Sequence, residues 1–249
     1  MNFQLLKYDS LGSTNTEAAE QARRGAAEGV CILAYKQTAG RGRHGRAWHS
    51  EAGSGLYLSI IVRPRLSPHH LPLITLAAGV AVYHVLKEFG INADIKWVND
   101  VLVGDGKISG ILAETVETEQ GIAVIVGVGI NLSSSSFPEE LAEIATSVEV
   151  ETGSKPTPDE AAEAVTRYFA YFYEMLHSEN GPQQIVENWR SRSSYFSGKQ
   201  VRVAANNDVF EGTTDGLEPN GALRVKLADG EIRIVQAGDV TRLRSHERQ

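Results

Sequence analysis

Cysteine is almost missing from this 249-residue sequence, which contains only Cys31. A lone cysteine cannot close an internal disulfide, so the sequence predicts a reducing compartment, the cytoplasm. Cys31 lies within the apolar run of residues 30–33, where a free cysteine usually acts as a small core hydrophobe. We therefore predict a core residue at this position and not a nucleophile.

Long hydrophobic runs are missing too. Residues 1–9 lack the apolar segment of a secretory signal, and no uncharged apolar stretch is long enough to span a bilayer. Positive charge is also scarce, because 24 Lys and Arg face 31 Asp and Glu and leave a net charge of −7. Broad binding of nucleic acid needs many contacts from Lys and Arg to phosphates. The sequence therefore predicts a protein with neither a membrane nor a DNA partner.

The remaining composition is that of an ordinary globular protein, with 42% hydrophobic and 22% charged residues. Apolar spacing and end signals predict helices over 14–24, 71–89, 157–176 and 183–192, the first and third with a capping box at Thr14–Glu17 and Thr157–Glu160. Strands are predicted over 30–35, 56–62, 93–98, 107–114 and 122–130. We expect 93–98 and 107–114 to form a hairpin with an elaborated loop, and 107–114 could also pair with 122–130.

The pattern changes from residue 198 onward. Short alternating segments at 201–203, 209–212, 223–227 and 232–235 are separated by turn residues. Short strands at this spacing predict a small antiparallel barrel. We therefore divide the chain into domains 1–197 and 198–249, and expect the second domain to pack on the first because it can bury only a modest core.

A loop rich in glycine and arginine is the sharpest chemical feature. Residues 40–46 read Gly-Arg-Gly-Arg-His-Gly-Arg. Glycine lets backbone N–H groups approach an anion closely, and arginine forks match carboxylate and phosphate geometry. The loop lacks the Gly-Lys-Ser/Thr ending of a P-loop and does not fit the dinucleotide fingerprint. It predicts a focused anion site, with a flexible basic loop as the alternative.

Two further motifs follow along the chain. Residues 96–100 read Lys-Trp-Val-Asn-Asp, and Lys107 opens a strand directly after a glycine turn, where an ammonium can face developing negative charge. A solvated strand end, a plain turn and a core role for Trp97 are the alternatives. Residues 127–131 read Gly-Val-Gly-Ile-Asn, in which glycines permit close approach of a planar group and Asn131 offers a donor and an acceptor. A bulged strand is the alternative reading there.

Taken in order, these motifs resemble the catalytic domain of biotin–protein ligases over roughly residues 9–132. The resemblance implies an α+β fold: a mixed sheet with helices, similar to class II aminoacyl-tRNA synthetases, followed by a small SH3-like β-barrel. It implies an enzyme that joins biotin to ATP as biotinyl-5′-AMP and then transfers biotin to a lysine. ATP and Mg²⁺ are the implied cofactors. The implied partner is the biotin carboxyl carrier domain of a biotin-dependent carboxylase, and a homodimer formed through the sheet is expected of the family.

The resemblance also implies roles for individual residues. Catalysis would rest on Arg43, Lys107 and Asp100, without a protein metal site. Biotin would be bound by Ser13, Thr14, Asn15, Gln37, Gly40, Arg41, Gly42, Arg43, Lys107 and Gly110. ATP and the adenylate would be bound by Arg43, Arg46, Trp48, Asn99, Lys107 and Asn131.

Two departures from the family pattern stand out. Val98 occupies a position where the family usually has proline, and we expect a local backbone adjustment there. Ser13 begins the first motif so early that we expect no N-terminal DNA-binding domain. Two other functions remain in view. A lipoate or octanoate ligase would share the fold but lack the arginine-rich loop, and a non-catalytic adenylate sensor would not need intact Arg43 and Lys107.

Overall fold

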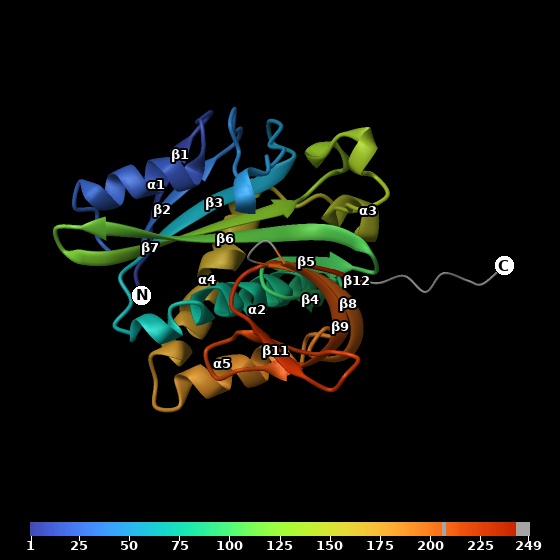
Figure 1. Ribbon diagram of the computed structural model, residues 1–249. Coiled ribbons are helices and arrows are strands. Elements are labelled where there is room, and N and C mark those ends of the chain that lie inside the picture. Colours follow the sequence, from blue (N-terminus) through green and yellow to red (C-terminus); the bar gives the residue numbers. More distant parts are fainter. Residues whose placement is uncertain (206–207, 243–249) are drawn as a thin grey trace.

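The computed structural model describes residues 1–205 and 208–242 and has two sheets (Figure 1). The first is mixed and seven-stranded, in the order β1-β2-β3-β7-β6-β5-β4, and the second is antiparallel and five-stranded, in the order β11-β10-β9-β8-β12. The first sheet comprises β1 (Gln4–Tyr8), β2 (Val30–Ala34), β3 (Gly55–Val62), β4 (Asp94–Lys96), β5 (Asp100–Val103), β6 (Gly106–Thr118) and β7 (Gly121–Asn131). The second comprises β8 (Ser197–Ala205), β9 (Asp208–Leu217), β10 (Leu223–Lys226), β11 (Ile232–Val235) and β12 (Asp239–Arg242). The helices are α1 (Thr14–Arg23), α2 (Leu73–Glu88), α3 (Val148–Thr152), α4 (Pro158–Leu176) and α5 (Gly181–Arg190).

Helices cover both faces of the first sheet. Successive side chains of a strand point to opposite faces. Accordingly, Ile61 and Ile125 pack with α1, whereas Ile60 and Val126 pack in the larger cluster with α2 and α4. Figure 1 shows α1 above the sheet and α2, α4 and α5 below it. Cys31 is fully buried in the larger cluster, and burial raises its pKa to about 12, so the predicted core role is confirmed.

Helix α2 lies at the centre of the larger cluster. Together with the preceding turn it forms a segment, Pro68–Glu88, that is long and apolar enough to cross a membrane by length and composition alone. In the structure, however, 61% of its apolar 18-residue window is buried within the protein. The core of a large domain also contains helices that are apolar on all sides. The composition of this segment therefore fits a core helix.

The two predicted capping boxes have different outcomes. At α4, Glu160 N donates to Thr157 Oγ1 over 3.2 Å and Thr157 N donates to Glu160 Oε2 over 2.7 Å, as predicted. At α1 the prediction is wrong, because the side chain of Ser13 forms no cap and Thr14 N donates instead to Gln37 Oε1 over 2.8 Å. Gln37, in the loop after β2, thus accepts the hydrogen bond from the Thr14 N–H, for which the sequence pattern had predicted Glu17 as the partner.

The predicted hairpin between 93–98 and 107–114 is also wrong. An extra strand, β5, lies between them and pairs antiparallel with β4 on one side and β6 on the other. The strand forms because Val101 and Leu102 are buried in the core. The possible pairing of the strands at 107 and 122 is confirmed as β6 with β7. At Val98, the Trp97–Val98 peptide bond is cis.

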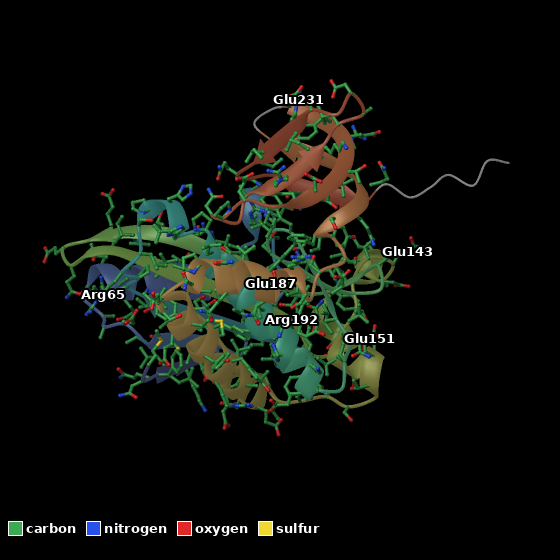
Figure 2. All side chains as sticks on the ribbon, turned by 90° about the horizontal axis from the view of Figure 1, so that it is seen from below. Arg65, Glu143, Glu151, Glu187, Arg192 and Glu231 are labelled. Atoms are coloured by element: carbon green, nitrogen blue, oxygen red, sulfur yellow. The ribbon has the colours of Figure 1, made fainter. Side chains whose placement is uncertain are left out.

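The second sheet packs against the first part of the chain. Trp97, only 2% exposed, donates its indole N–H to Gly221 O over 2.9 Å, which confirms Trp97 as a core residue. Val201, Val203 and Leu223 belong to the same apolar cluster as α2. Figure 2, in which Glu231 labels the outer end of this sheet, shows the sheet standing at one side of the molecule. Strand β12 was not predicted, because Asp239–Arg242 has no apolar alternation beyond one valine.

We expect His84 to make the stability of the fold sensitive to acid. Its ring stacks 5.4 Å from Tyr168 and its buried Nε2 has no partner in the described part of the chain. Burial lowers the pKa of His84 below its ordinary value near 6.5, and Arg192 and Lys87 lower it further. The folded state therefore favours the neutral ring, so stability should be complete above about pH 6.5 and fall as pH drops below it. Thermal unfolding between pH 5 and 7 should show a smaller slope in His84→Phe, and equal slopes would contradict this assignment.

Candidate active site

A cavity opens on the face of the first sheet that carries α1. Its walls come from the start of α1, from the loop that follows β2, from strands β6 and β7, and from the second sheet. The lining includes most of the predicted site residues: Ser13, Thr14, Asn15, Gln37, Arg41, Gly42, Arg43, Arg46, Trp48, Asn99, Asp100, Lys107 and Gly110. Segments almost a hundred residues apart therefore converge on one site.

Glycines form the floor of this cavity. A Cβ atom at Gly127 would lie 2.2 Å from Asn15 Oδ1, and one at Gly129 would lie 2.6 Å from Trp48 Cε2. Gly110 is similarly covered by Trp48 at 2.9 Å. The planar group that approaches these glycines is the indole of Trp48, whose buried Nε1 has no acceptor among the described residues.

One end of the cavity is a polar network. Ser59 Oγ donates to Asn15 Oδ1 over 2.6 Å and lies 2.8 Å from Thr14 Oγ1. Asn15 Nδ2 in turn donates to Glu114 Oε2 over 2.8 Å. Gln37 accepts from Thr14 and donates to Ser50 over 2.8 Å. Because each side chain is fixed by another, the donors and acceptors of this end are oriented before a ligand arrives.

The glycine-arginine loop is held by internal bonds and by contacts to the first sheet. Gly42 N donates to Arg46 O over 2.7 Å, and Arg41 bridges to Ala47. Arg41 also forms an ion pair with Glu114 of β6 over 2.6 Å. Arg43 turns inward, where its Nη1 donates to Asn99 Oδ1 over 3.2 Å. The loop thereby brings its arginines to the cavity from one side.

Lys107 reaches the cavity from the opposite strand. Its backbone is clamped, since its N–H donates to Ile144 O over 2.8 Å and its carbonyl accepts from Thr146 N over 3.0 Å. Its ammonium lies 2.6 Å from Asp100 Oδ1 and 5.5 Å from the centre of the Trp48 ring. Burial lowers the pKa of the Arg43 guanidinium, and the charge of Asp100 opposes that shift. Asp100 thus forms an ion pair with Lys107 and is close enough to Arg43 for its charge to act on that guanidinium.

Comparisons with known proteins identify relatives of this chain. Residues 9–131 match the model of the biotin/lipoate A/B protein ligase family, and residues 196–242 match that of the biotin protein ligase C-terminal domain. The bifunctional ligase/repressor BirA of Bacillus subtilis is 37% identical over 95% of this chain and 74% of its own length. The biotin–[acetyl-CoA-carboxylase] ligase of Mycobacterium tuberculosis is 33% identical over 94% of this chain and 86% of its own.

This chain belongs to the biotin protein ligase family. A solved structure of the Aquifex aeolicus biotin protein ligase in complex with biotin and ATP superposes with a TM-score of 0.84 at 28% identity, covering 97% of this chain and 99% of that one. The α+β fold class and the ligase activity expected from the sequence are therefore confirmed.

Two predicted residues of this biotin protein ligase family member do not line the cavity. Asn131 is buried and its amide donates to Lys107 O over 3.2 Å and to Thr146 O over 2.9 Å. Gly40 begins the loop and lies against residue 48, where a Cβ atom would meet Trp48 O at 2.3 Å. Asn131 therefore holds the strand that carries Lys107. Gly40, which has no side chain, allows the start of the loop to pack against residue 48 at its end.

Sequence reasoning missed three contributors to the ligase cavity. Ser59 lies within the otherwise apolar strand β3, and a single polar residue in such a run was a usable signal. Tyr57, on the same strand, lines the cavity, whereas Ser59 contributes through its contacts with Thr14 and Asn15. Asp239 comes from β12 of the second sheet, and nothing in its local sequence indicated a role in a site built by residues 13–129.

Proposed function

We propose that this protein condenses biotin with ATP to biotinyl-5′-AMP and transfers biotin to a lysine of a carboxylase carrier domain. The observation that carries the proposal is the convergence of Arg43 and Lys107, from separate segments, on one cavity with a preoriented polar end. The names of two relatives, both biotin–[acetyl-CoA-carboxylase] ligases, support the choice of a carboxylase as acceptor.

The first half-reaction needs charge neutralisation. The biotin carboxylate attacks the α-phosphate of ATP, which brings two anions together and expels pyrophosphate. Arg43 and Lys107 offset that charge, and Asp100 keeps Lys107 in place through their 2.6 Å ion pair. The product is a mixed anhydride with AMP as a good leaving group.

Binding roles follow from the cavity. Thr14, Asn15 and Gln37 offer the donors and acceptors that suit the ureido group of biotin. The glycine floor beneath Trp48 suits planar rings, and the unpartnered indole N–H is a donor for a ligand acceptor. Arg46 and Asn99, which also line the cavity, would contact the nucleotide.

Mg²⁺ would enter as a complex with ATP. Among the described residues no group of three or more His, Cys, Asp or Glu could hold a metal ion by itself. Asp100 and Asp239 line the cavity and are the carboxylates that could contact this complex. Mg²⁺ usually binds through one or two carboxylates plus phosphates and supplies charge neutralisation.

The second half-reaction needs a lysine from outside. Its amine, once deprotonated, forms an amide with the biotinyl carbonyl and releases AMP. Asp100 is the carboxylate in the cavity that could receive the ammonium of the incoming lysine, next to Lys107. We propose Asp100 as the group that orients the acceptor amine.

The outer half of β6 offers a docking edge for the carrier. Strand β5 pairs with β6 only as far as Gly110, and Ile111 bonds to Asn99. Residues two apart face the same way, so Ala113 and Thr115 turn backbone N–H and C=O groups toward the unpaired side. A groove of about 390 Å³ follows this edge and shares Arg43 with the cavity. A carrier strand added to β6 would place its lysine at Arg43. The same edge would also serve a homodimer.

Thr115→Pro should separate the two half-reactions. Proline removes an N–H that points to the unpaired edge and leaves the bonds between β6 and β7 intact. Labelling of the carrier should fall by about tenfold, as for loss of one or two backbone bonds, while biotinyl-AMP synthesis falls much less. Thr115→Ala, which keeps the N–H, is the control. Equal labelling by both variants would exclude this edge.

A direct assay tests the function itself. The protein is incubated with ATP, Mg²⁺ and a biotin carrier domain, with biotin or with lipoate, and products are read by mass spectrometry. Biotinylated carrier and AMP are expected with biotin. Lipoylation alone would favour the lipoate ligase, and nucleotide binding without transfer would favour the sensor.

Three further features belong to the proposal. Residue 197 divides the catalytic domain from the C-terminal domain, which is supported by the start of β8 at Ser197. The protein acts in the cytoplasm, which its lone buried cysteine favours. It works without a DNA partner, for which the net charge of −7 argues.

A further inference from the structure

The glycine-arginine loop is tied to the C-terminal sheet as well as to the catalytic sheet. Arg46 forms an ion pair with Asp239 at the start of β12. Arg43 Nη1 donates to the carbonyl of Gly238 over 3.2 Å. His44 Nε2 lies 4.0 Å from Asp239 Oδ1. Gly238, just before β12, and Asp239, its first residue, therefore contact three residues of the loop.

The C-terminal side of this contact is held by strand pairing. Asp239 pairs with Ala204 in the ladder between β12 and β8. Gly238 lies so close to that ladder that a Cβ atom there would meet Ala204 O at 2.8 Å. The loop, in contrast, buries no residue between Arg43 and Gly45. The position of the loop consequently depends on polar contacts, which Arg41 and Arg43 make to the catalytic sheet and its neighbours and Arg43 and Arg46 make to the C-terminal sheet.

Arg43 links this contact to the chemistry. The same guanidinium nitrogen that donates to Gly238 O also donates to Asn99 Oδ1, beside Asp100. A shift of the loop away from β12 would withdraw Arg43 from the cavity and open the cavity on the side of Arg46. Since a mixed anhydride reacts with water and with any free amine, an open loop costs selectivity as well as rate.

We propose that Asp239, presented by β12 beside the Gly238 carbonyl, is a positioning residue that latches the glycine-arginine loop and so retains the biotinyl adenylate until a carrier lysine arrives. This inference rests on the proposed function. Without the latch the adenylate leaves the cavity, and a lysine amine of any nearby protein attacks its acyl carbon. The C–N bond forms, the bond from the acyl carbon to the phosphate oxygen breaks, AMP departs and the amine proton passes to water.

A different reading gives an opposite result. Asp239 could compete with the nucleotide phosphates for Arg46. Asp239 is an anion that lines the cavity, and the phosphates are anions that would enter it. Removing the carboxylate would then free Arg46 and strengthen ATP binding, without release of the adenylate. The two readings are separated by measuring the KM for ATP and the release of biotinyl-AMP on the same variants.

The test compares Asp239→Ala with Asp239→Glu in the full chain. Purified protein is given biotin, ATP and Mg²⁺, and three quantities are measured: biotinyl-AMP released into solution, biotin attached to serum albumin as a bystander, and biotin attached to a carrier domain. Asp239→Ala should raise adenylate release and albumin labelling by about tenfold, the scale of one lost charged hydrogen bond. Asp239→Glu keeps the carboxylate and should restore most of the retention.

Asp208→Ala is the matched control, because it removes an aspartate that pairs with Arg233 over 2.7 Å in the same sheet. It should behave as the unaltered protein. Arg46→Ala removes the other partner of the latch and should also release adenylate, which guards against a folding defect specific to position 239. Melting temperatures of all variants are recorded.

The outcomes are distinct. If the unaltered protein makes no biotinyl-AMP, the proposed function fails. If it does, but Asp239→Ala releases no more adenylate than Asp208→Ala, the latch fails. A lower KM for ATP without release also overturns the latch in favour of competition.

Discussion

Lys107→Ala should reduce the rate of biotinyl-AMP formation by at least about a hundredfold, which is the usual effect of removing one charged group from a developing anion. The Lys107 ammonium approaches the cavity from β6, and the backbone N–H and C=O of Lys107 are both bonded to the neighbouring segment, at residues 144 and 146. The fold should therefore keep its shape when the side chain is shortened, so that the loss falls on the chemical step. Pyrophosphate release in the absence of carrier measures that step.

Lys96→Ala is the matched control for this prediction. Lys96 also pairs with Asp100, at 3.5 Å, but does not line the cavity. If the main task of Lys107 were to neutralise Asp100, both variants would be impaired alike. A Lys107→Ala protein that released pyrophosphate at a rate within threefold of the control would remove Lys107 from the proposed mechanism.

Gly127→Ala should abolish most biotin binding. The added Cβ atom would lie 2.2 Å from Asn15 Oδ1, and Asn15 cannot turn away freely because Ser59 and Glu114 hold it. Overpacking of this kind costs about 1–3 kcal/mol, which corresponds to roughly a tenfold to hundredfold weaker affinity if the cavity carries the cost. Isothermal titration with biotin measures the affinity, and thermal unfolding measures the share that falls on stability.

Two comparison proteins sharpen this test. Gly12→Ala adds the same methyl group where nothing lies within 4 Å and should bind biotin normally. The double variant Asn15→Ala/Gly127→Ala removes the clash, so it should regain stability without regaining affinity, because the Asn15 amide is lost. Normal affinity in Gly127→Ala would show that biotin does not use this end of the cavity.

The order of the motifs along the sequence identified the family. This was possible because few residue types can bind a phosphate and a carboxylate. Glycine and arginine in the 40–46 loop and Lys107 after its turn were recognisable without a structure. Periodicity located most of the helices and strands for the same reason, since a buried face needs apolar residues at a fixed spacing. The capping box at α4 is local, and was therefore predicted correctly.

Contacts between distant segments could not be predicted from the sequence. Strand β5 was missed because Asp100–Val103 is short and is stabilised by its neighbours in the sheet. The start of α1 was misread because its N–H partner, Gln37, lies 23 residues away. Asn131 looked like a ligand-binding residue, and the structure directs its amide to the backbone of Lys107 instead.

The amino-acid sequence alone determined the family, the α+β class and the set of charged groups available to the reaction, since each depends on residue type and on spacing along the chain. Only the tertiary structure decided which of these groups meet. Ser59 joins Asn15, and Asp239 of the C-terminal sheet joins Arg46, because packing brings together side chains whose separation in sequence carries no signal.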